Sequence, residues 1–189
     1  MHPPCHPYFF VLYQLYIFSV SMNWIVYHAV TTNHEPRDEQ GQYISLTHGV
    51  KKLKKLSQTV QAIVWDEELY VQAVSAGVAP ISGVFHVVLS TQKLLNTWGD
   101  NVWITDIALK QVRRELKIQG FEQVLCLTNA YTTGQLIKAK FIQYLTLDVI
   151  QSLHSGEQVV VENLDKVSQK WTLLSQKLSK DVLTLSYQL

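Results

Sequence analysis

The chain has 189 residues, a net charge of +1 and 47% hydrophobic residues, which suits a single domain with its own core. Charged residues make up only 16%, which excludes an intrinsically disordered chain, and the near-zero net charge excludes a globally basic nucleic-acid binder. The two cysteines, Cys5 and Cys126, are too few for a disulfide framework or a cysteine-rich zinc site. Cys126 lies in an apolar run and is predicted to be a buried free thiol.

Residues 1–21 form an uncharged, largely apolar N-terminal extension, and residues 22–189 are predicted to form one α/β domain. The first formally charged residue is Glu35, and the mainly apolar residues 8–30 are long enough to cross a bilayer. Three interpretations remain open. If Met22 is the true start, residues 1–21 are spurious and a cytoplasmic protein is expected; otherwise the extension is a membrane anchor or a packed helix.

The first half of the domain is predicted to alternate short strands and short helices. Runs rich in β-branched and aromatic residues predict strands at 23–30, 59–65 and 84–90. Capping residues and apolar spacing predict helices at 45–57 and 91–97. Asp66, Glu67 and Glu68 are interpreted as a solvent-facing turn, with Leu69–Ser75 as a hairpin partner for the strand before it.

The second half shows a clearer alternation of strands and helices. Strands are predicted at 102–105, 121–128, 157–162 and 183–189. Helices are predicted at 106–119, 132–154 and 164–178, the last with Trp171 in the middle of its apolar stripe. The whole pattern predicts an α/β fold with a mixed, mainly parallel sheet of about six to eight strands flanked by helices.

The junction between the strand at 121–128 and the following helix is the main candidate for a ligand site. In α/β folds, ligands usually bind where strand carboxyl ends lead into helix N-termini, whose free N–H groups favour anions. The predicted ligand-binding residues are Asn129, Thr132, Thr133 and Gly134. The alternative is that Thr132 caps the helix and Gly134 merely lies in its first turn.

The same stretch resembles the ribose-phosphate loop of the phosphoribosyltransferases, in which an apolar strand ends in two acidic residues followed by Thr-Thr-Gly. The resemblance covers residues 124–137, and the acidic pair would fall at Thr128 and Asn129, which carry no charge. It therefore implies a degenerate site for a phosphate-bearing or otherwise anionic small ligand, and a transferase-like origin.

The predicted order of elements also resembles the acyl-CoA-dependent N-acetyltransferases. Residues 102–109 are similar to the strand that precedes the pyrophosphate-binding turn of that family. The family's glycine-containing motif should follow, but residues 110–119 contain no glycine. The resemblance therefore implies an N-acyltransferase-like topology without its cofactor motif, and the sequence leaves the cofactor open.

Basic residues cluster on two predicted helices. Four lysines lie within residues 51–55, and the second group forms a basic patch of Lys110, Arg113, Arg114 and Lys117. Such a patch can hold anions or form the surface of a non-catalytic interaction domain, although it is usually just a solvated helix face.

Nucleic acid is not expected as a partner, a membrane is expected only through residues 8–30, and no metal site is predicted. His86, in an apolar strand, is interpreted as a core histidine. No residue constellation demonstrates catalysis.

Overall fold

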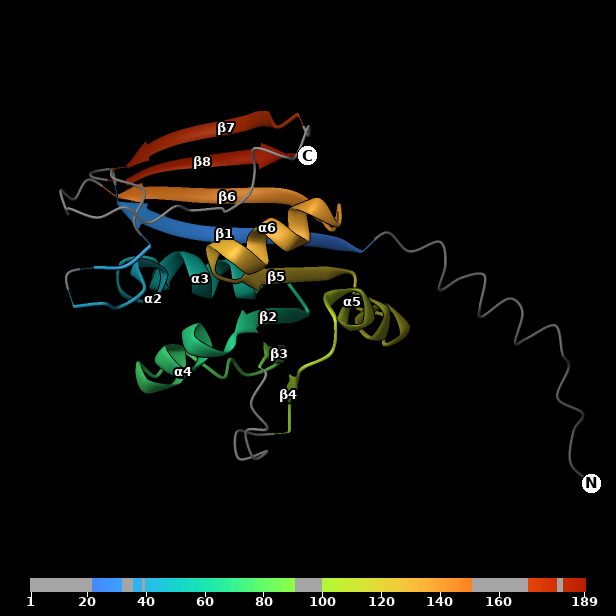
Figure 1. Cartoon of the computed structure of the whole chain (residues 1–189). Helices are drawn as coiled ribbons and strands as arrows, with labels where there is room; N and C mark the ends of the chain where they lie inside the picture. Colours follow the sequence, from blue (N-terminus) through green and yellow to red (C-terminus); the bar gives the residue numbers. More distant parts are fainter. Residues whose placement is uncertain (1–21, 32–35, 39, 91–99, 151–169, 180–181) are drawn as a thin grey trace, which may run out of the picture.

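A computed structural model gives the structure of residues 22–31, 36–38, 40–90, 100–150, 170–179 and 182–189. An eight-stranded sheet in the order β4-β3-β2-β5-β1-β6-β8-β7 forms the centre of the molecule (Figure 1). The strands are β1 Asn23–Thr31, β2 Ala62–Asp66, β3 Phe85–Leu89, β4 Val102–Thr105, β5 Gln123–Leu127, β6 Ile142–Ile150, β7 Thr172–Ser179 and β8 Val182–Gln188.

The sheet is mixed and mainly parallel. Strands β4, β3, β2, β5, β1 and β6 run parallel to one another, and β8 pairs antiparallel with β6 and β7. Every residue of β2 is buried, as expected for a central parallel strand that is covered on both faces. The predicted fold, a single α/β domain with a mixed and mainly parallel sheet, is therefore confirmed.

Helices cover both faces of the parallel part of the sheet. On one face lie α2 Ile44–Thr47, α3 Val50–Ser57 and α4 Glu67–Ser75, and on the other lie α5 Leu109–Ile118 and α6 Ala130–Lys138. Trp65 belongs to the first hydrophobic cluster, and Trp24 and Cys126 to the second; all three are fully buried. Cys126 is a free thiol, as predicted.

The predicted hairpin partner at Leu69–Ser75 is wrong, because these residues belong to α4. Asp66 adopts the extended N-cap conformation, and Glu67 and Glu68 fill the first turn, where negative charge interacts favourably with the helix dipole. The three acidic residues thus start a helix instead of making a hairpin turn.

The long helix predicted over 132–154 is also wrong. Helix α6 ends at Lys138, and Lys140 has a positive φ of 56°, which reverses the chain before β6 begins. Residues of β6 alternate between the two faces of the sheet, with Leu145 on the side of α6 and Asp148 on the side of α3. The apolar residues of β6 therefore belong to a strand within the sheet and not to a helix that is buried on all sides.

The helix predicted over 164–178 is wrong at least from Thr172, where β7 begins. The 3–4 spacing of apolar residues that suggested a helix includes Leu174, which coincides with an irregularity in the pairing of β7 with β8. One extra residue in a strand changes which positions share a face, and so an alternating pattern can imitate a helical one.

The other predicted elements in the described part of the chain occur at or near their expected places. Strands β1 to β5 and β8 and helix α5 differ from the predicted ranges by at most about three residues at either end, while the helix expected at 45–57 is divided into α2 and α3. The extension 1–21, the helix predicted at 91–97 and the strand predicted at 157–162 lie outside the described residues. In the part of the chain with described structure, no helix is long and apolar enough to span a bilayer.

Candidate functional site

Two adjoining hollows lie at the carboxyl ends of the parallel strands β2, β3 and β4. They have volumes of about 510 and 290 Å³ and share Asp66, Leu89 and Ser90. We call them together the acidic groove. Its remaining lining residues come from α4, α6 and the segment between β4 and α5: Glu67, Glu68, Val71, Thr105, Asp106, Ile107, Ala108, Leu109, Asn129, Tyr131, Thr132 and Gln135.

Asp66 connects the two helices that border the groove. Its carboxylate accepts a hydrogen bond from the backbone N–H of Asn129 and a second one from the Thr132 hydroxyl at 2.9 Å. Asn129 in turn caps α6, because its Oδ1 accepts from the backbone N–H of Thr132 at 2.8 Å. The N-terminus of α6 is therefore already supplied with hydrogen-bond acceptors by the chain itself, one of them a carboxylate.

The environment of Asp66 also changes its acidity. The side chain is buried, and burial raises the pKa of the carboxyl group above its usual range. The hydrogen bonds from Asn129 and Thr132 act in the opposite direction, and the nearby Glu68 adds to the increase. The carboxyl group is thus held between burial, which favours its neutral form, and two donors, which favour its charged form.

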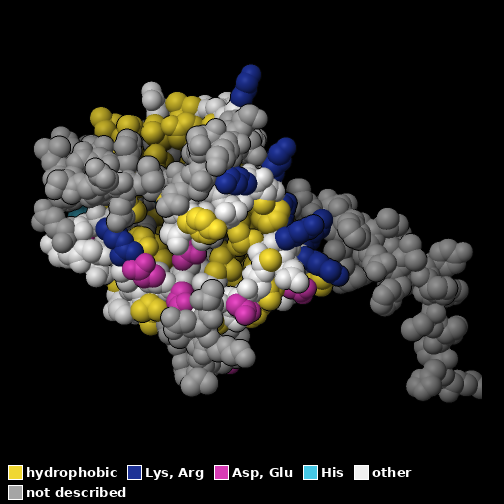
Figure 2. All heavy atoms as spheres, in the orientation of Figure 1, with side chains coloured by type: hydrophobic (Ala, Val, Ile, Leu, Met, Phe, Trp, Pro, Cys, Tyr) yellow, Lys and Arg dark blue, Asp and Glu magenta, His cyan; other side chains and the backbone are white. Residues whose placement is uncertain are grey.

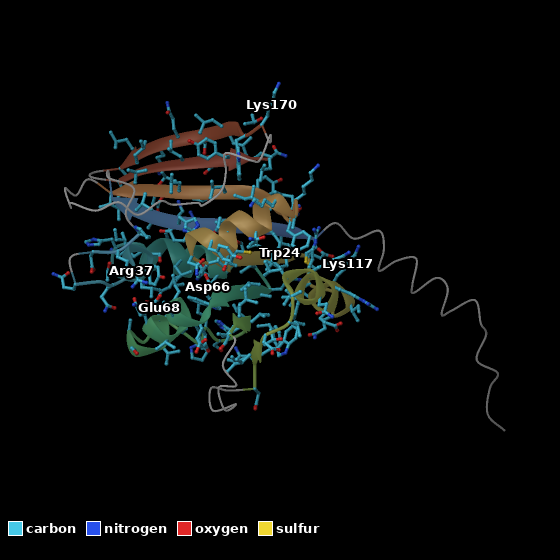
Figure 3. The ribbon with its side chains drawn as sticks, viewed as in Figure 1. Trp24, Arg37, Asp66, Glu68, Lys117 and Lys170 are labelled. Atoms are coloured by element: carbon cyan, nitrogen blue, oxygen red, sulfur yellow. The ribbon has the colours of Figure 1, made fainter. Side chains whose placement is uncertain are left out.

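Glu67 and Glu68 in the first turn of α4 have different partners. Glu67 accepts a hydrogen bond from Ser90 at 2.5 Å, at the carboxyl end of β3. Glu68 forms an ion pair with Arg37 at 2.8 Å, and the Arg37 guanidinium lies over the ring of Tyr43 at 4.1 Å from its centroid. Figure 3 shows Arg37, Glu68 and Asp66 on the same side of the molecule. The partly exposed Arg37–Glu68 pair leaves Glu68 in contact with solvent.

Among the described residues, four carboxylate side chains line the groove, on Asp66, Glu67, Glu68 and Asp106, and no described lining residue is Lys or Arg. Figure 2 shows Asp and Glu side chains gathered on this face, while several Lys and Arg side chains lie farther along it. Among the described residues, no group of three or more His, Cys, Asp or Glu side chains is placed to hold a metal ion. The groove is therefore a negatively charged hollow with apolar walls.

A buried polar chain lies between β1 and α6, next to the groove. The Nε2 atom of His28 is 3.0 Å from the Thr133 hydroxyl, which lies 2.8 Å from the hydroxyl of Thr128. All three side chains are buried, and burial lowers the pKa of His28 to about 4. This chain anchors α6 to the sheet, and it does not line either hollow.

The structure separates the residues that were predicted to form one anion site. Asn129 and Thr132 line the groove, whereas Thr133 and Gly134 are buried in α6. The basic patch of Lys110, Arg113, Arg114 and Lys117 lies on α5, and no member of it lines the groove. Figure 3 shows Lys117 well apart from Asp66.

Arg113 is held away from the groove by a contact of its own. Its guanidinium lies 4.5 Å from the centroid of the Phe141 ring, and burial lowers its pKa. The predicted supply of positive charge from α5 to the loop at 129–136 is therefore not present in the structure.

Sequence reasoning missed Asp66, Glu67, Ser90 and Asp106 as groove residues. A signal for the first two was available, because an acidic residue at the end of a buried strand, followed by two more, is typical of a helix N-cap and first turn. The position of Ser90 could not be inferred in the same way. It depends on the pairing of β2 with β3, which brings residues 66 and 89 to the same level of the sheet.

Comparisons with known proteins find the fold but no family. No protein-family model and no curated protein matches this sequence. A putative riboflavin biosynthesis protein from Shewanella sp. PV-4 has a similar structure, with a TM-score of 0.74 and 16% identity over 88% of this chain and 98% of its own.

Two further solved structures share the arrangement. RibD from Acinetobacter baumannii matches with a TM-score of 0.70 and 13% identity. The match covers 90% of this chain and 58% of the RibD chain. Dihydrofolate reductase from Enterococcus faecalis, complexed with NADP(H) and RAB-propyl, matches with a TM-score of 0.60 and 11% identity over 88% of this chain and 95% of its own. At such low identities the likeness shows a shared fold alone.

These findings correct the functional interpretations made from the sequence. The similar structures are reductases and riboflavin biosynthesis proteins, so the phosphoribosyltransferase-like and N-acetyltransferase-like interpretations are wrong. The predicted binding of an anion at 129–136 is wrong as well, because the Asp66 carboxylate occupies that helix N-terminus.

Proposed function

We propose that this protein binds an unphosphorylated small molecule with amino groups, such as an amino-substituted pyrimidine, in the acidic groove. The observation that carries the proposal is the charge of the groove: its described lining residues include four carboxylate side chains and no cationic one. Amino groups donate hydrogen bonds that carboxylates accept, and charge-assisted bonds of this kind are the stronger class.

The size and walls of the groove suit a ligand of this type. Its larger hollow, of about 510 Å³, falls in the range of roughly 300–1,000 Å³ that is usual for small-molecule sites. Val71 and Leu89 provide apolar surface, and the exposed ring of Tyr131 lies at the smaller hollow. A flat heterocycle can cover these apolar groups while its amino groups face Glu67 and Glu68.

The names of structural neighbours support the ligand class. One similar structure is a pyrimidine reductase-like protein from Corynebacterium diphtheriae, at 10% identity. Another, from Thermotoga maritima, is named as a deaminase and reductase of amino-substituted pyrimidine and uracil compounds that carry a phosphoribosyl group. The proposed ligand of this chain keeps the amino-substituted ring and lacks the phosphate.

NADP(H), which is bound in the similar dihydrofolate reductase, does not fit the described groove. Phosphate groups are normally held by free backbone N–H groups at helix N-termini and by basic side chains. Here the first turn of α4 carries Glu67 and Glu68, and the start of α6 is occupied by Asp66 and Asn129. A dinucleotide phosphate would therefore meet like charges, and we derive no hydride-transfer step for this protein.

The test is an NMR titration of the full chain with 2,4-diaminopyrimidine, and with uracil and NADPH in parallel. We expect amide shifts near residues 66–68, 89–90 and 129–132 with the diamine, and smaller or no shifts with uracil, which has no exocyclic amino group. Glu67→Gln should weaken diaminopyrimidine binding about tenfold, the scale of one charge-assisted hydrogen bond. Glu122→Gln, at an exposed residue just before β5, should leave it unchanged.

Two outcomes would overturn the proposal. The first is the absence of shifts with diaminopyrimidine up to millimolar concentration. The second is tighter binding of NADPH than of the diamine in the same groove, which would show that the acidic lining does not exclude phosphates.

A further inference from the structure

The two hollows of the acidic groove differ in their chemistry. The larger hollow contains three of the four carboxylate side chains, on Asp66, Glu67 and Glu68. The smaller hollow shares Asp66 and adds Asp106, and the other described residues that line it are uncharged. Negative charge is therefore concentrated beside α4 and decreases toward the start of α5.

Apolar side chains make up much of the wall of the smaller hollow. Ile107 and Leu109 line it, and Leu89 lines both hollows. All three side chains are half-buried and pack against the second hydrophobic cluster, so each presents apolar surface both to the core and to the hollow. Figure 2 shows hydrophobic side chains beside the Asp and Glu side chains on this face. The hollow, of about 290 Å³, has room for an apolar group of the size of a phenyl ring.

Tyr131 adds an aromatic ring to the same hollow. It lies in the first turn of α6, lines the smaller hollow and is 57% exposed. The backbone that carries it is held in place, because the Asn129 side chain caps the helix two residues earlier. Aromatic rings pair favourably with other rings in offset-stacked or edge-to-face arrangements. An exposed ring beside an apolar hollow is therefore a suitable contact for a second ring of a ligand.

The junction between the two hollows is fixed by hydrogen bonds of the chain itself. Asp66 accepts from the backbone N–H of Asn129 and from the Thr132 hydroxyl, and Ser90 donates to Glu67. Asp66 and Ser90 line both hollows, so the hollows adjoin at side chains that already have partners. A single molecule can extend across this junction without displacing either side chain.

We propose that the ligand of the groove has two parts: the amino-substituted ring in the larger hollow, and an uncharged, apolar group, best an aromatic ring, in the smaller one. This inference rests on the proposed function, because Glu67 and Glu68 anchor the first part. Small-molecule sites are mostly apolar, with a few polar groups that fix orientation, and the smaller hollow supplies the apolar portion. Tyr131 is then a specificity-determining residue that favours two-ring ligands over a single ring.

The first experiment compares 2,4-diaminopyrimidine with its 6-phenyl and 6-hydroxymethyl derivatives on the full chain, by calorimetric and NMR titration. We expect the 6-phenyl compound to bind about tenfold more tightly than the unsubstituted diamine, the scale for burying about half of a phenyl group. The polar hydroxymethyl group should give no such gain. Amide shifts with the 6-phenyl compound should extend to residues 107–109 and 131–135, beyond those near residues 66–68.

The second experiment tests the role of the Tyr131 ring. Tyr131→Ser should weaken binding of the 6-phenyl compound about fivefold more than binding of the unsubstituted diamine, the scale of one aromatic pair. Tyr131→Phe should preserve the preference, because the ring remains. The side chain is exposed, so both variants should fold, which circular dichroism checks. The matched control is Ile118→Ser, at an exposed residue at the far end of α5 that lines neither hollow.

The outcomes separate this inference from the proposed function. Binding of the unsubstituted diamine with no gain from the phenyl group, or with an equal gain from the hydroxymethyl group, would overturn the two-part ligand and leave the proposed function in place. An equal effect of Tyr131→Ser on both compounds, or shifts with the 6-phenyl compound that spare residues 107–109 and 131–135, would overturn it too. If none of the three compounds binds, the proposed function fails and this inference fails with it.

Discussion

Several buried polar side chains in this protein have a specific partner on another strand or helix. The indole N–H of Trp65 donates to Nδ1 of His86 at 2.9 Å, so the expectation of a core histidine is confirmed. His28 reaches Thr133 of α6, and Asp66 reaches Thr132 of the same helix. Since an unpaired polar group in the core costs about 1–3 kcal/mol, these contacts determine where α6 lies on the sheet.

His28 should make the protein less stable in mild acid. Burial lowers its pKa from 6.5 to about 4, so between these values the unfolded chain binds a proton that the folded chain does not. Stability therefore falls as the pH falls, by about 2 kcal/mol between pH 7 and pH 4.5. We expect His28→Gln to lose this part of the pH dependence of the free energy of unfolding, measured with urea. The exposed His48→Gln is the control, and equal slopes for the wild type and His28→Gln would contradict the prediction.

Gly49 should tolerate no side chain, because the helix pair α2–α3 approaches β1 closely at this point. A Cβ atom on Gly49 would lie 2.5 Å from the Tyr27 hydroxyl oxygen and 2.9 Å from backbone atoms of Ser45. We expect Gly49→Ala to lower the free energy of unfolding by about 1–3 kcal/mol, the usual cost of overpacking. Thr47→Ala, at an exposed position, should change it little. Equal stability of the two variants would show that the helix pair can shift.

At the scale of elements, the structure depends on how strand ends lead into helices. The acidic groove exists because β2 and β5 both end at the same edge of the sheet, and because each is followed directly by a helix. Strand β3 ends at the same edge, where Ser90 meets Glu67. Three short segments that are distant in sequence thus supply the groove, as is usual at the carboxyl edge of parallel sheets.

Trp171 should contribute less to stability than a tryptophan in the middle of a helix stripe. It directly precedes β7, is only partly buried, and contacts the ring of Tyr187 edge-on at 6.3 Å between centroids. We expect Trp171→Ala to cost about 1–2 kcal/mol, against about 3–5 kcal/mol for a fully buried tryptophan. Leu116→Ala, at a fully buried position of α5, is the reference and should cost about 2–5 kcal/mol. A larger loss for Trp171→Ala than for Leu116→Ala would indicate that another segment covers it.

At the scale of the molecule, both hydrophobic clusters lie within the described part of residues 22–189 and share one sheet. Tyr27 and Trp65 project to one cluster, while Val26 and Val64, their neighbours in sequence, project to the other. Loss of packing on either face therefore affects both layers, which favours one cooperative unfolding transition.

Removal of residues 1–21 should leave this core intact. We expect residues 22–189 to unfold in a single urea transition, with a free energy of unfolding within about 1 kcal/mol of that of the full chain, because no described core residue precedes Met22. The measurement compares the two chains by circular dichroism and tryptophan fluorescence. A molten shorter chain beside a cooperatively folded full chain would contradict the prediction and show that the extension is part of the core.

The sequence by itself determined the α/β class, the central strands and the helix α5, because these depend on local periodicity and on apolar runs such as those of β2 and β5. It also placed a helix start at the sheet edge near Thr132, although α6 begins at Ala130 and its cap is Asn129. Periodicity misled where strands alternate or bulge, as in β6 and β7. Only the tertiary structure decided that Asp66 fills the predicted anion position, since the two segments are 63 residues apart and meet through strand pairing. The sign of the groove's charge likewise follows from which strands become neighbours, and a single sequence does not encode that in any local pattern.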